Sequence, residues 1–594
     1  MGAKAERGGG AAFPAPDTPK PSGSGDNAVV LTMLLPYVSQ TRYGELCNLW
    51  DDSPESFDHI NTYKPALSGI LTFGENDALA RVENTCPFRI EAAILSSLRD
   101  AETRRGDLFI DDKEIVDRVN NFLKRNACPM RQQVLLGKPD ILSALEALLQ
   151  KGLVVQDHTK SCGICYFLQD NYTCEKDAAL FLADLITARP KPLLPLDAVG
   201  SAIHQYESSV KLVLSSEQAQ AIRTVLGNTV FIITGGPGTG KTTLLAALCA
   251  VIHILAPGTK IRACAPTGKA AIHLAGVIGL PTSTIHSLIG PKPHKINCDV
   301  LFVDEASMID IKLFCNFLNS IRKSTYVVFC GDPDQLPCVG GGDVLRDMIA
   351  SGKIPVAMLT QIHRQTAGSS MIRLAHRIKT EDLCQALDIS AFLTGDLMLI
   401  RSEDEAITQK SILDTVASLL AAGTNPNDIQ ILAATNDWCD SLNPQLRTIL
   451  NPAAATDREL NGYTTGDRVL FLENDYAVQL HNGEIGTILN VLDRHLEIDC
   501  GNSTVKYRRE DLGKLSLAYA MTIHKAQGSE YPLVIIPIHK SMGQALTRNL
   551  VYTALTRAKK KCILIGSKET LLTALKRIDS HRSLLSERLA GLLP

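Results

Sequence analysis

"FIITGGPGTGKTTLLAAL", residues 231–248, decides the fold of the central part of this chain. An apolar run precedes a glycine-rich turn, and a helical pattern begins at Lys241. This spacing is typical of a phosphate-binding loop, in which backbone N–H groups at the start of a helix cradle phosphates and the lysine reaches the β- and γ-phosphate oxygens. The predicted nucleotide site consists of Gly235, Gly236, Pro237, Gly238, Thr239, Gly240, Lys241, Thr242 and Thr243.

Short apolar strands alternate with helical patterns on both sides of this loop. The strands read "TVFIIT", "IRACA", "DVLFV" and "TYVVFC", and later "DIQILAAT", "PLVIIPI" and "KCILIG". This rhythm predicts parallel sheets covered by helices, an α/β fold. Ligands of such sheets bind at the carboxyl ends of the strands. We therefore expect the chemically active residues to follow strands directly.

Acidic and amide side chains follow two of these strands. "LFVDEASM" supplies Asp304 and Glu305, and "VVFCGDPDQLP" supplies Gln335. Beside a phosphate-binding loop, Asp304 is expected to hold Mg²⁺ together with the Thr242 hydroxyl, and Glu305 to orient and deprotonate the attacking water. Gln335 can sense the γ-phosphate or that water. An isolated Asp-Glu pair is usually solvated surface, but after a buried strand the catalytic interpretation is favoured.

The motifs occur in a fixed order: "LSSEQAQAI", "GGPGTGKTT", "APTGKAA", "TIHSLIG", "DEASM", "GDPDQLP", "HRQ", "NGEIG", "TIHKAQGSE" and "YTALTRAKK". This series closely resembles the RecD-like branch of the superfamily 1 DNA helicases, over about residues 214–566. The resemblance implies two RecA-like motor domains with ATP in the cleft between them. It also implies 5′–3′ movement along one DNA strand.

The resemblance assigns further residues to the nucleotide. Gln218 would contact adenine, and Gly528 and Glu530 would lie near the nucleotide at the cleft. Arg364 of "HRQ" and Arg557 of "YTALTRAKK" would reach in from the second motor domain, where an arginine stabilises the charge that builds on the γ-phosphoryl oxygens. Taken singly, each arginine would be an ordinary surface residue, so their assignment depends on the whole pattern.

Donors suited to phosphate oxygens lie in motifs that resemble the DNA-contacting motifs of the family. Hydroxyl and imidazole donors position a nucleic-acid backbone without reading bases, as a moving motor requires. His524 alone would more often be a structural histidine, but in the complete motif DNA contact is favoured. The candidate DNA-binding residues are Pro266, Thr267, Lys269, Thr284, His286, Thr522 and His524.

Changes in composition and in hydrophobic pattern along the sequence predict several domains. Residues 1–27 read as a disordered tail, and residues 28–200 as a mainly helical, winged-helix-like docking domain. Motor domain 1 is expected at 201–355. Motor domain 2 is expected at 356–455 and 514–594, interrupted at 456–513 by a strand-turn-strand segment that corresponds to the SH3-like β-barrel of RecD-like helicases.

The composition limits which surfaces, compartments and metal sites the protein is expected to have. The 594 residues carry a formal net charge of −3, so a nucleic-acid surface must be a local basic patch. No apolar run reaches the length of a membrane span, and the 16 cysteines of an apparent nucleotide-binding protein indicate reduced thiols in the cytoplasm. His158, Cys162, Cys165 and Cys174 could hold zinc, but core or surface thiols are the favoured interpretation.

The expected function is an ATP-dependent 5′–3′ helicase or translocase on single-stranded DNA, acting in DNA recombination and repair. Only "PKPHKINCD" occupies the place where relatives often carry a strand-splitting pin, and no convincing pair of helix-hairpin-helix motifs precedes the motor. Both departures favour a RecD subunit that works with RecB-like and RecC-like partners. A partner-dependent regulatory subunit and an RNA helicase are the alternatives. No clustered acidic metal site for a nuclease is visible.

Overall fold

The computed structural model resolves the chain into two compact units, Met1–Tyr172 and Thr173–Pro594. The expected tail at residues 1–27 and the candidate Arg364 lie outside the described residues. The described segments are residues 71–80, 82–128, 134–188, 196–291, 294–361, 369–380, 395–475, 482–501 and 503–593, with single residues at 38, 42, 45, 46, 48, 63, 66, 393 and 480.

The first unit packs helices against a small antiparallel sheet of strand order β1-β3-β2. Helices α6 and α7 lie in the region that the sequence predicts to be mainly helical. Helix α5 ends at Gly106, whose φ of 69° is a left-handed conformation that suits glycine. The elements are α4 (Phe73–Leu79), α5 (Pro87–Arg105), β1 (Phe109–Asp111), α6 (Ile115–Asn126), α7 (Lys138–Gln150), β2 (Val154–Thr159) and β3 (Gly163–Leu168).

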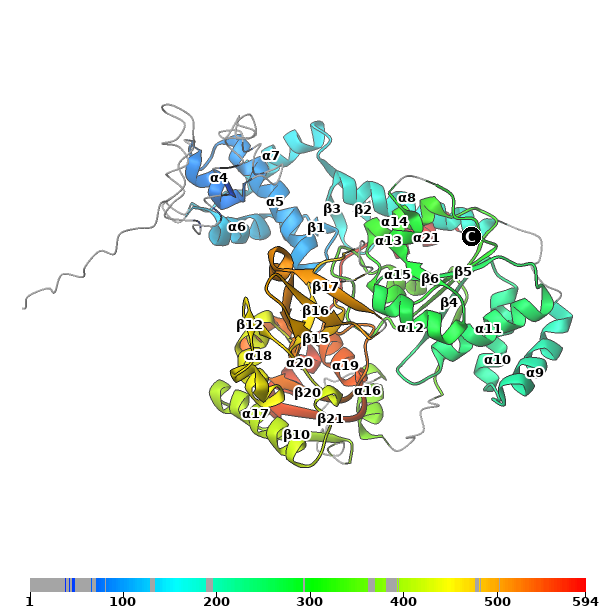
Figure 1. Ribbon diagram of the computed structural model, residues 1–594. Coiled ribbons are helices and arrows are strands. Elements are labelled where there is room, and N and C mark those ends of the chain that lie inside the picture. Colours follow the sequence, from blue (N-terminus) through cyan, green and yellow to red (C-terminus); the bar gives the residue numbers. More distant parts are fainter. Residues whose placement is uncertain are drawn as a thin grey trace, which may run out of the picture. The chain divides into compact units, whose positions relative to one another are not determined.

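The second unit contains a six-stranded parallel sheet of order β6-β5-β7-β8-β4-β9. Its central strands β7, β8 and β4 are largely apolar and fully buried, and helices α11 and α12 lie alongside the sheet (Figure 1). The elements are α8 (Gln169–Thr187), α9 (Val199–Val210), α10 (Ser216–Leu226), β4 (Val230–Gly235), α11 (Lys241–Leu255), β5 (Ile261–Ala265), α12 (Gly268–Ile278), β6 (Thr282–Thr284), α13 (Ile285–Ile289), β7 (Val300–Val303), α14 (Ile311–Ser320), β8 (Tyr326–Gly331), α15 (Val344–Ala350) and β9 (Val356–Leu359).

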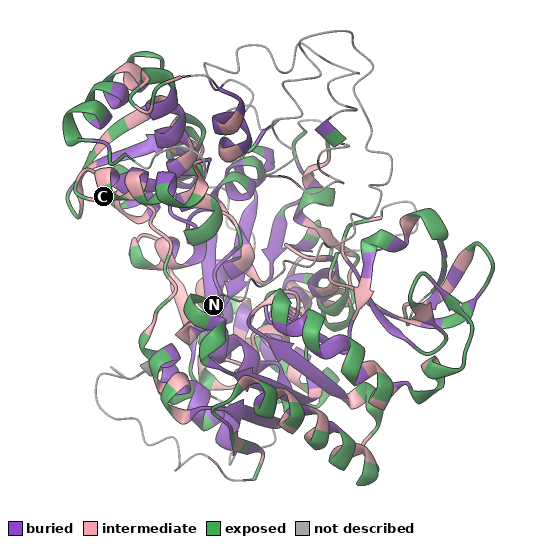
Figure 2. Ribbon diagram, turned by 90° about the vertical axis from the view of Figure 1, so that its left-hand side faces the viewer, coloured by how far each residue is buried: buried purple, intermediate pink, exposed green. Residues whose placement is uncertain are grey.

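A second parallel sheet, of order β10-β21-β20-β11-β19, follows in the same unit. Figure 2 shows the strands of the sheets buried and the outer faces of the covering helices exposed. The expected α/β class with parallel sheets is therefore confirmed. The elements are α16 (Ser370–Thr380), β10 (Leu397–Arg401), α17 (Glu405–Ala421), β11 (Ile429–Ala433), α18 (Asn436–Leu450), β19 (Ala520–Thr522), β20 (Tyr531–Ile538), α19 (Arg548–Thr556), β21 (Ala558–Gly566), α20 (Lys568–Lys576) and α21 (Leu585–Leu592).

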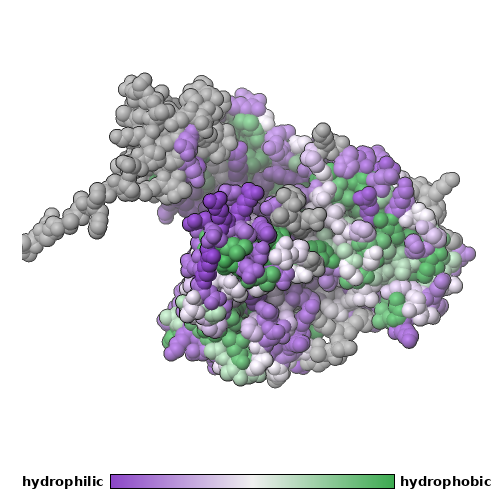
Figure 3. All heavy atoms as spheres, viewed as in Figure 1, coloured by the Kyte–Doolittle hydropathy of each residue, from purple (hydrophilic) through white to green (hydrophobic). Residues whose placement is uncertain are grey.

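An antiparallel sheet of order β17-β16-β15-β14-β18 is inserted between β11 and β19. Its alternating strands bury a separate apolar core that includes Phe471 and Tyr507. Hydrophilic side chains gather over this region on the face shown in Figure 3. The elements are β12 (Glu459–Leu460), β13 (Tyr463–Thr464), β14 (Arg468–Phe471), β15 (Ile485–Val491), β16 (His495–Asp499), β17 (Thr504–Arg508) and β18 (Leu515–Leu517).

The structure divides the chain differently from the sequence in three places. Most of α8 belongs to the second unit, before the boundary expected at residue 200. Strand β9 pairs with β4, so the first parallel sheet continues past residue 355. Helix α21 packs on α15, and Arg588 Nε lies 2.8 Å from Glu175 Oε2 of α8, so the end of the chain joins the first parallel-sheet domain. All three differences arise from contacts between segments that are distant in sequence. Such contacts produce no periodic pattern in the sequence.

Within the described residues, none of the helices combines the length and the apolar content that crossing a membrane requires.

Candidate functional site

The phosphate-binding loop connects β4 to α11 as the sequence predicts. Gly238 and Gly240 have φ values of 73° and 82°, conformations that L-residues with a side chain rarely adopt. A Cβ on Gly235 would lie 2.8 Å from the carbonyl oxygen of Leu359, which leaves no room for a side chain. Lys241 Nζ donates to the carbonyl oxygen of Gly235 at 2.6 Å and to that of Gly236 at 3.2 Å. The lysine therefore lies over the loop that is expected to hold phosphates.

Asp304 and Glu305 follow β7, two strands from the loop in the sheet. Asp304 is 8% exposed, and its Oδ1 accepts the backbone N–H of Glu305 at 2.9 Å. Glu305 has a φ of 51°, a strained conformation for a residue with a side chain. Strain of this kind, on the order of 1–3 kcal/mol, is concentrated at functional sites.

The electrostatics of this carboxylate pair match a catalytic role. Burial raises the pKa of both groups, and the Asp304 carboxylate raises the pKa of Glu305 further. Lys241 opposes these shifts for both carboxylates, and Arg557 opposes them for Glu305. A carboxylate with a raised pKa and a cation nearby is suited to accepting a proton from water.

Arg557 reaches from the second parallel-sheet domain to the first. It is 5% exposed, and its Nη2 lies 3.3 Å from Gln335 Oε1. Its Nε and Nη1 donate to the carbonyl oxygens of Thr553 and Ser529, each at 3.2 Å. These contacts fix the guanidinium at the side of the site where Glu305 lies. The structure therefore brings Lys241, Asp304, Glu305, Gln335 and Arg557 together.

Two further residues, neither of them predicted from the sequence, join the domains beside the loop. The Tyr552 hydroxyl donates to Asp332 Oδ2 at 2.7 Å, and a Cβ on Gly236 would lie 3.4 Å from that hydroxyl. Burial and the Asp332 carboxylate raise the pKa of Tyr552 well above its usual value, which keeps the hydroxyl a donor. Lys379 Nζ of α16 lies 2.7 Å from Asp334 Oδ2. Tyr552 belongs to the motif "YTALTRAKK", which could have identified it, whereas Lys379 belongs to no motif.

A cavity of about 100 Å³ lies beside the loop. Its walls combine the loop residue Pro237 with apolar side chains of β9 and α16, among them Leu359 and Ile372. Gln218, the expected adenine contact, is 4% exposed, and its Oε1 accepts the backbone N–H of Ser215 at 3.0 Å. This contact is a capping box at the start of α10. The adenine contact of Gln218 remains a prediction.

Gly528 and Glu530 occupy different surroundings. Gly528 has a φ of 71°, and a Cβ there would lie 3.5 Å from the Cβ of Ala270 on α12. Glu530 Oε2 lies 3.3 Å from Lys559 Nζ, and its side chain is 40% exposed. Gly528 therefore lies against the "APTGKAA" motif, and the nucleotide contacts of both residues remain predictions.

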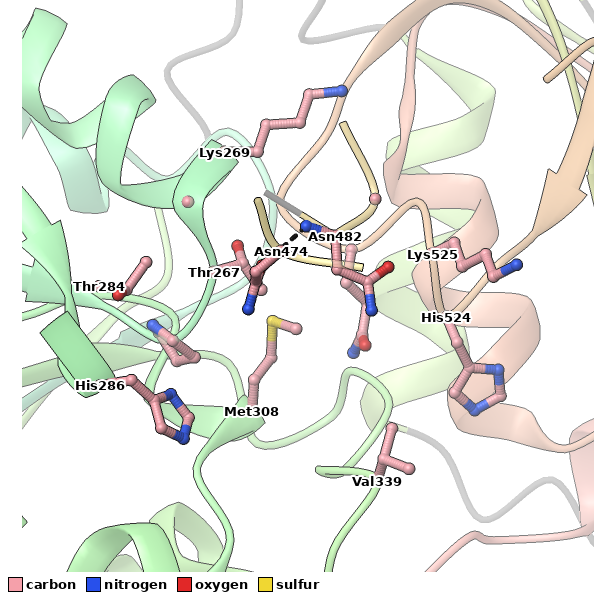
Figure 4. Close-up of a pocket in the computed structure, with 14 residues that line it drawn as sticks. Thr267, Lys269, Thr284, His286, Met308, Val339, Asn474, Asn482, His524 and Lys525 are labelled. Atoms are coloured by element: carbon pink, nitrogen blue, oxygen red, sulfur yellow. Dashed lines mark hydrogen bonds between the residues drawn. The ribbon is translucent and has the colours of Figure 1, made fainter. Parts of the chain in front are cut away.

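Six of the seven candidate DNA-binding residues line one pocket of about 290 Å³. In Figure 4, Thr284 and His286 lie on one side, His524 and Lys525 on the other. Asn474 and Asn482 of the inserted domain lie between them, joined by a hydrogen bond of 2.8 Å from the Asn482 N–H to Asn474 Oδ1. The six residues are Pro266, Thr267, Lys269, Thr284, His286 and His524.

The two threonines of this pocket begin helices. Thr267 Oγ1 accepts the N–H of Ala270 at 3.3 Å, and Thr284 Oγ1 accepts the N–H of Ser287 at 3.1 Å. Each hydroxyl therefore keeps its hydrogen for a second partner, because accepting a bond uses only the oxygen. Thr522, by contrast, is 7% exposed and does not line the pocket; it accepts the N–H of Lys525 at 3.4 Å.

The pKa values of Lys269 and His524 are both lowered. Burial lowers the pKa of Lys269 to about 8. Its Nζ lies 5.4 Å from the centre of the Tyr531 ring, and Figure 4 shows its ammonium directed away from the other lining residues. Burial also lowers the pKa of His524, so its imidazole is neutral near pH 7 and donates through one nitrogen only.

No group of three or more His, Cys, Asp or Glu residues that could hold a metal ion occurs in the described part of the chain. Cys165 is fully buried, and Cys174 shares a hydrogen bond with Cys315. Thr242 and Asp304 would supply one hydroxyl and one carboxylate to Mg²⁺. Hard oxygen donors of this kind fit a magnesium ion that takes its other ligands from phosphates and water.

Two family models match the chain, an AAA domain over residues 213–392 and a UvrD-like helicase C-terminal domain over residues 517–565. The chain is 32% identical over 408 residues to the ATP-dependent RecD2 DNA helicase of Deinococcus radiodurans, an alignment that covers 66% of this chain and 55% of that protein. It is 29% identical over 503 residues to the RecBCD enzyme subunit RecD of Mycolicibacterium smegmatis, covering 77% of this chain and 84% of that one.

The chain thus spans about half the length of the Deinococcus relative and most of the Mycolicibacterium relative. Among solved structures, the Pif1 helicase from Bacteroides in complex with ADP-AlF3 and ssDNA is similar at 20% identity. That match has a TM-score of 0.39 and covers 62% of this chain and 95% of the other.

Proposed function

We propose, since this chain belongs to the RecD-like helicases of superfamily 1, that it is an ATP-dependent DNA helicase that moves 5′–3′ along single-stranded DNA. The observation that carries the proposal is the contact between Arg557 and Gln335, which links the second parallel-sheet domain to the first beside Glu305. Hydrolysis at a cleft between two domains can change their separation, and two domains that alternate their grip on a strand will step along it.

The contacts around the loop support the following proposed roles in hydrolysis, and the role of Arg364 comes from the family resemblance. Lys241 and the loop N–H groups bind the phosphates, and Thr242 and Asp304 would hold Mg²⁺, which neutralises phosphate charge when bound. Glu305 takes the proton of the attacking water, and Gln335 orients that water. Arg557 stabilises the charge on the γ-phosphoryl oxygens, as does Arg364. Tyr552 and Lys379 position the second domain on the Asp332–Asp334 segment.

The track is proposed to run through the pocket of Thr267, Thr284 and His524. The two parallel-sheet domains act as the RecA-like motor domains. The inserted antiparallel domain is an SH3-like barrel, and its Asn474 and Asn482 help to hold the strand, since both line the pocket. The pocket offers mainly neutral donors, which suit a backbone that must slide without sequence preference.

Replacing His524 with alanine is expected to raise the DNA concentration for half-maximal ATPase stimulation about three- to tenfold, the cost of one hydrogen bond. The maximal rate at saturating DNA should change little, because His524 is not among the residues of the ATP site. The loss should be equal at pH 7 and pH 8, since a lowered pKa leaves the imidazole neutral at both. His253→Ala, which removes an exposed histidine, is the control. An unchanged DNA requirement would remove His524 from the track.

Single strands that carry biotin at one end test the direction of movement without requiring strand separation. We expect the isolated chain to displace streptavidin from the 3′ end, and not from the 5′ end, in an ATP-dependent way. RNA of equal length should stimulate ATPase less. Displacement from the 5′ end instead would contradict the polarity, and equal or stronger stimulation by RNA would favour an RNA helicase.

The segment where relatives often carry a strand-splitting pin bears on whether this chain needs partner subunits. Between α13 and β7, the described residues 290–291 and 294–299 form no helix or strand. Strand separation is therefore proposed to require RecB-like and RecC-like subunits, docked on the N-terminal unit, in DNA recombination and repair. The proposed location is the cytoplasm, since an ATP-driven DNA motor acts where both molecules are found. Stimulated ATPase without unwinding by the isolated chain would support this dependence.

A further inference from the structure

Lys269, the second residue of helix α12, reaches across the boundary between the two parallel-sheet domains. Its helix belongs to the first domain, and its Nζ lies 5.4 Å from the centre of the Tyr531 ring, at the start of β20 in the second domain. Tyr531 is 8% exposed, so the contact is largely closed to water. Figure 4 shows the Lys269 ammonium directed away from the other residues that line the DNA pocket.

The Lys269 ammonium faces the Tyr531 ring without a hydrogen-bonding or ion-pair partner among the residues that the structure describes. Burial lowers the pKa of Lys269 to about 8; the Glu484 carboxylate opposes this shift, and the guanidiniums of Arg468 and Arg557 add to it. A cation over the face of an aromatic ring is attracted by the ring quadrupole, and more strongly where water is excluded. The ring therefore offsets part of the cost of placing a charge at this boundary.

The contact lies between the DNA pocket and the ATP site. On one side, Thr267 of the pocket precedes α12, and its Oγ1 accepts the N–H of Ala270 at 3.3 Å, one residue after Lys269. On the other side, the N–H of Tyr531 donates to the carbonyl oxygen of Arg557 at 2.8 Å. A shift of the start of α12 is therefore passed to the backbone of Arg557 through one side-chain contact.

We propose that Lys269 is a positioning residue that holds Tyr531, and through it Arg557, in place when DNA occupies the pocket of Thr267. The inference rests on the proposed function, since it assigns Lys269 to the coupling between DNA binding and ATP hydrolysis. It replaces the role that the family resemblance suggested, in which the Lys269 ammonium would bind a DNA phosphate. The two roles predict different effects of removing the charge.

Lys269→Met keeps an unbranched side chain and removes the charge. We expect the maximal DNA-stimulated ATPase rate to fall about three- to tenfold, the contribution of one cation–π contact from which water is excluded. The affinity for single-stranded DNA without nucleotide, and its dependence on salt, should not change. Lys269→Arg should restore most of the rate, because a guanidinium also stacks on aromatic faces.

Lys260→Met removes an exposed lysine of the same domain and is the matched control, which should change neither the rate nor the affinity. A slope of log affinity against log salt that is reduced by about 1 in Lys269→Met would show a lost phosphate contact and overturn the proposal. An unchanged maximal rate would overturn it as well.

Variants of Tyr531 test whether the ring is the partner. Tyr531→Leu should lower the maximal rate, and adding Lys269→Met to it should cause no further loss, because both substitutions remove the same contact. Tyr531→Phe keeps the ring and loses only the hydroxyl, which donates to Met521 Sδ at 3.7 Å, so it should keep most of the rate. Thermal melting of each variant checks folding. Losses that multiply in the double variant would contradict the proposal.

The pH profile separates charge from packing. Because the pKa of Lys269 is about 8, its ammonium loses the proton as the pH rises from 7 to 9, and the contact is lost with it. The DNA-stimulated rate of the unsubstituted chain should therefore fall over this range relative to Lys269→Arg, whose guanidinium stays charged. Burial raises the pKa of Tyr531, which keeps the ring neutral. Identical profiles would contradict a role for the charge.

Failure of the proposed function has a separate signature. An absence of DNA stimulation in the unsubstituted chain would overturn the proposed function and this inference with it. Normal stimulation in the unsubstituted chain that is equally strong in Lys269→Met would overturn the inference alone.

Discussion

Lys241→Ala is expected to lower DNA-stimulated ATP hydrolysis about a thousandfold, measured as phosphate release at saturating single-stranded DNA. The Lys241 ammonium donates hydrogen bonds to the carbonyl oxygens of Gly235 and Gly236. These residues belong to the loop whose N–H groups are proposed to bind the phosphates. The guanidinium of Arg557 does not replace it there, because it is held by Ser529, Thr553 and Gln335.

Lys260→Ala controls for the removal of a lysine, since Lys260 is an exposed residue of the same domain. It should retain full activity. The melting temperature of Lys241→Ala should fall only modestly, because the substitution removes two hydrogen bonds to loop carbonyls and a cation that acts on Asp304 and Glu305. Full ATPase activity in this variant would refute the assignment of the nucleotide site.

Arg557→Ala is expected to reduce the maximal rate of ATP hydrolysis by about 10³–10⁵-fold, with a KM for ATP within a few-fold of the original. An arginine that acts on the transition state contributes little to binding of the ground state, so the loss should appear in kcat. Binding of a non-hydrolysable ATP analogue provides an independent check of nucleotide affinity.

A structural role for Arg557 must be separated from this catalytic role. Removing it leaves the buried oxygens of Gln335 and Ser529 without their partner, at a cost of about 1–3 kcal/mol of stability. Arg557→Lys keeps the charge but cannot make both contacts, because lysine has no planar fork. We expect it to recover most of the stability and only part of the rate. A variant that is less stable but hydrolyses ATP normally would show that Arg557 only joins the domains.

Local sequence patterns predicted the parts of the site that directly follow a buried strand. The phosphate-binding loop and the Asp304–Glu305 pair follow β4 and β7, as the apolar runs indicated. Parallel strands bring such residues to one edge of the sheet, so order along the sequence was enough.

Contacts between distant segments could not be predicted in this way. Tyr552 meets Asp332 across 220 positions in sequence, and Asn549 meets Asp334 across 215. Asn474 and Asn482 line the proposed DNA pocket although they belong to the inserted domain. The capping contact of Gln218 could not be predicted for another reason. Its position in the sequence fits both a nucleotide contact and the start of a helix.

The rate of ATP hydrolysis by the purified chain, with and without single-stranded DNA, tests the central claim most directly. In the proposed mechanism, closing of the two parallel-sheet domains on ATP depends on DNA bound in the pocket of Thr267, Thr284 and His524. We therefore predict that DNA raises the rate at least tenfold, and that Lys241→Ala and Arg557→Ala each abolish the rise. An ATPase rate that is the same with and without DNA, in a folded chain that binds both ligands, would contradict the account.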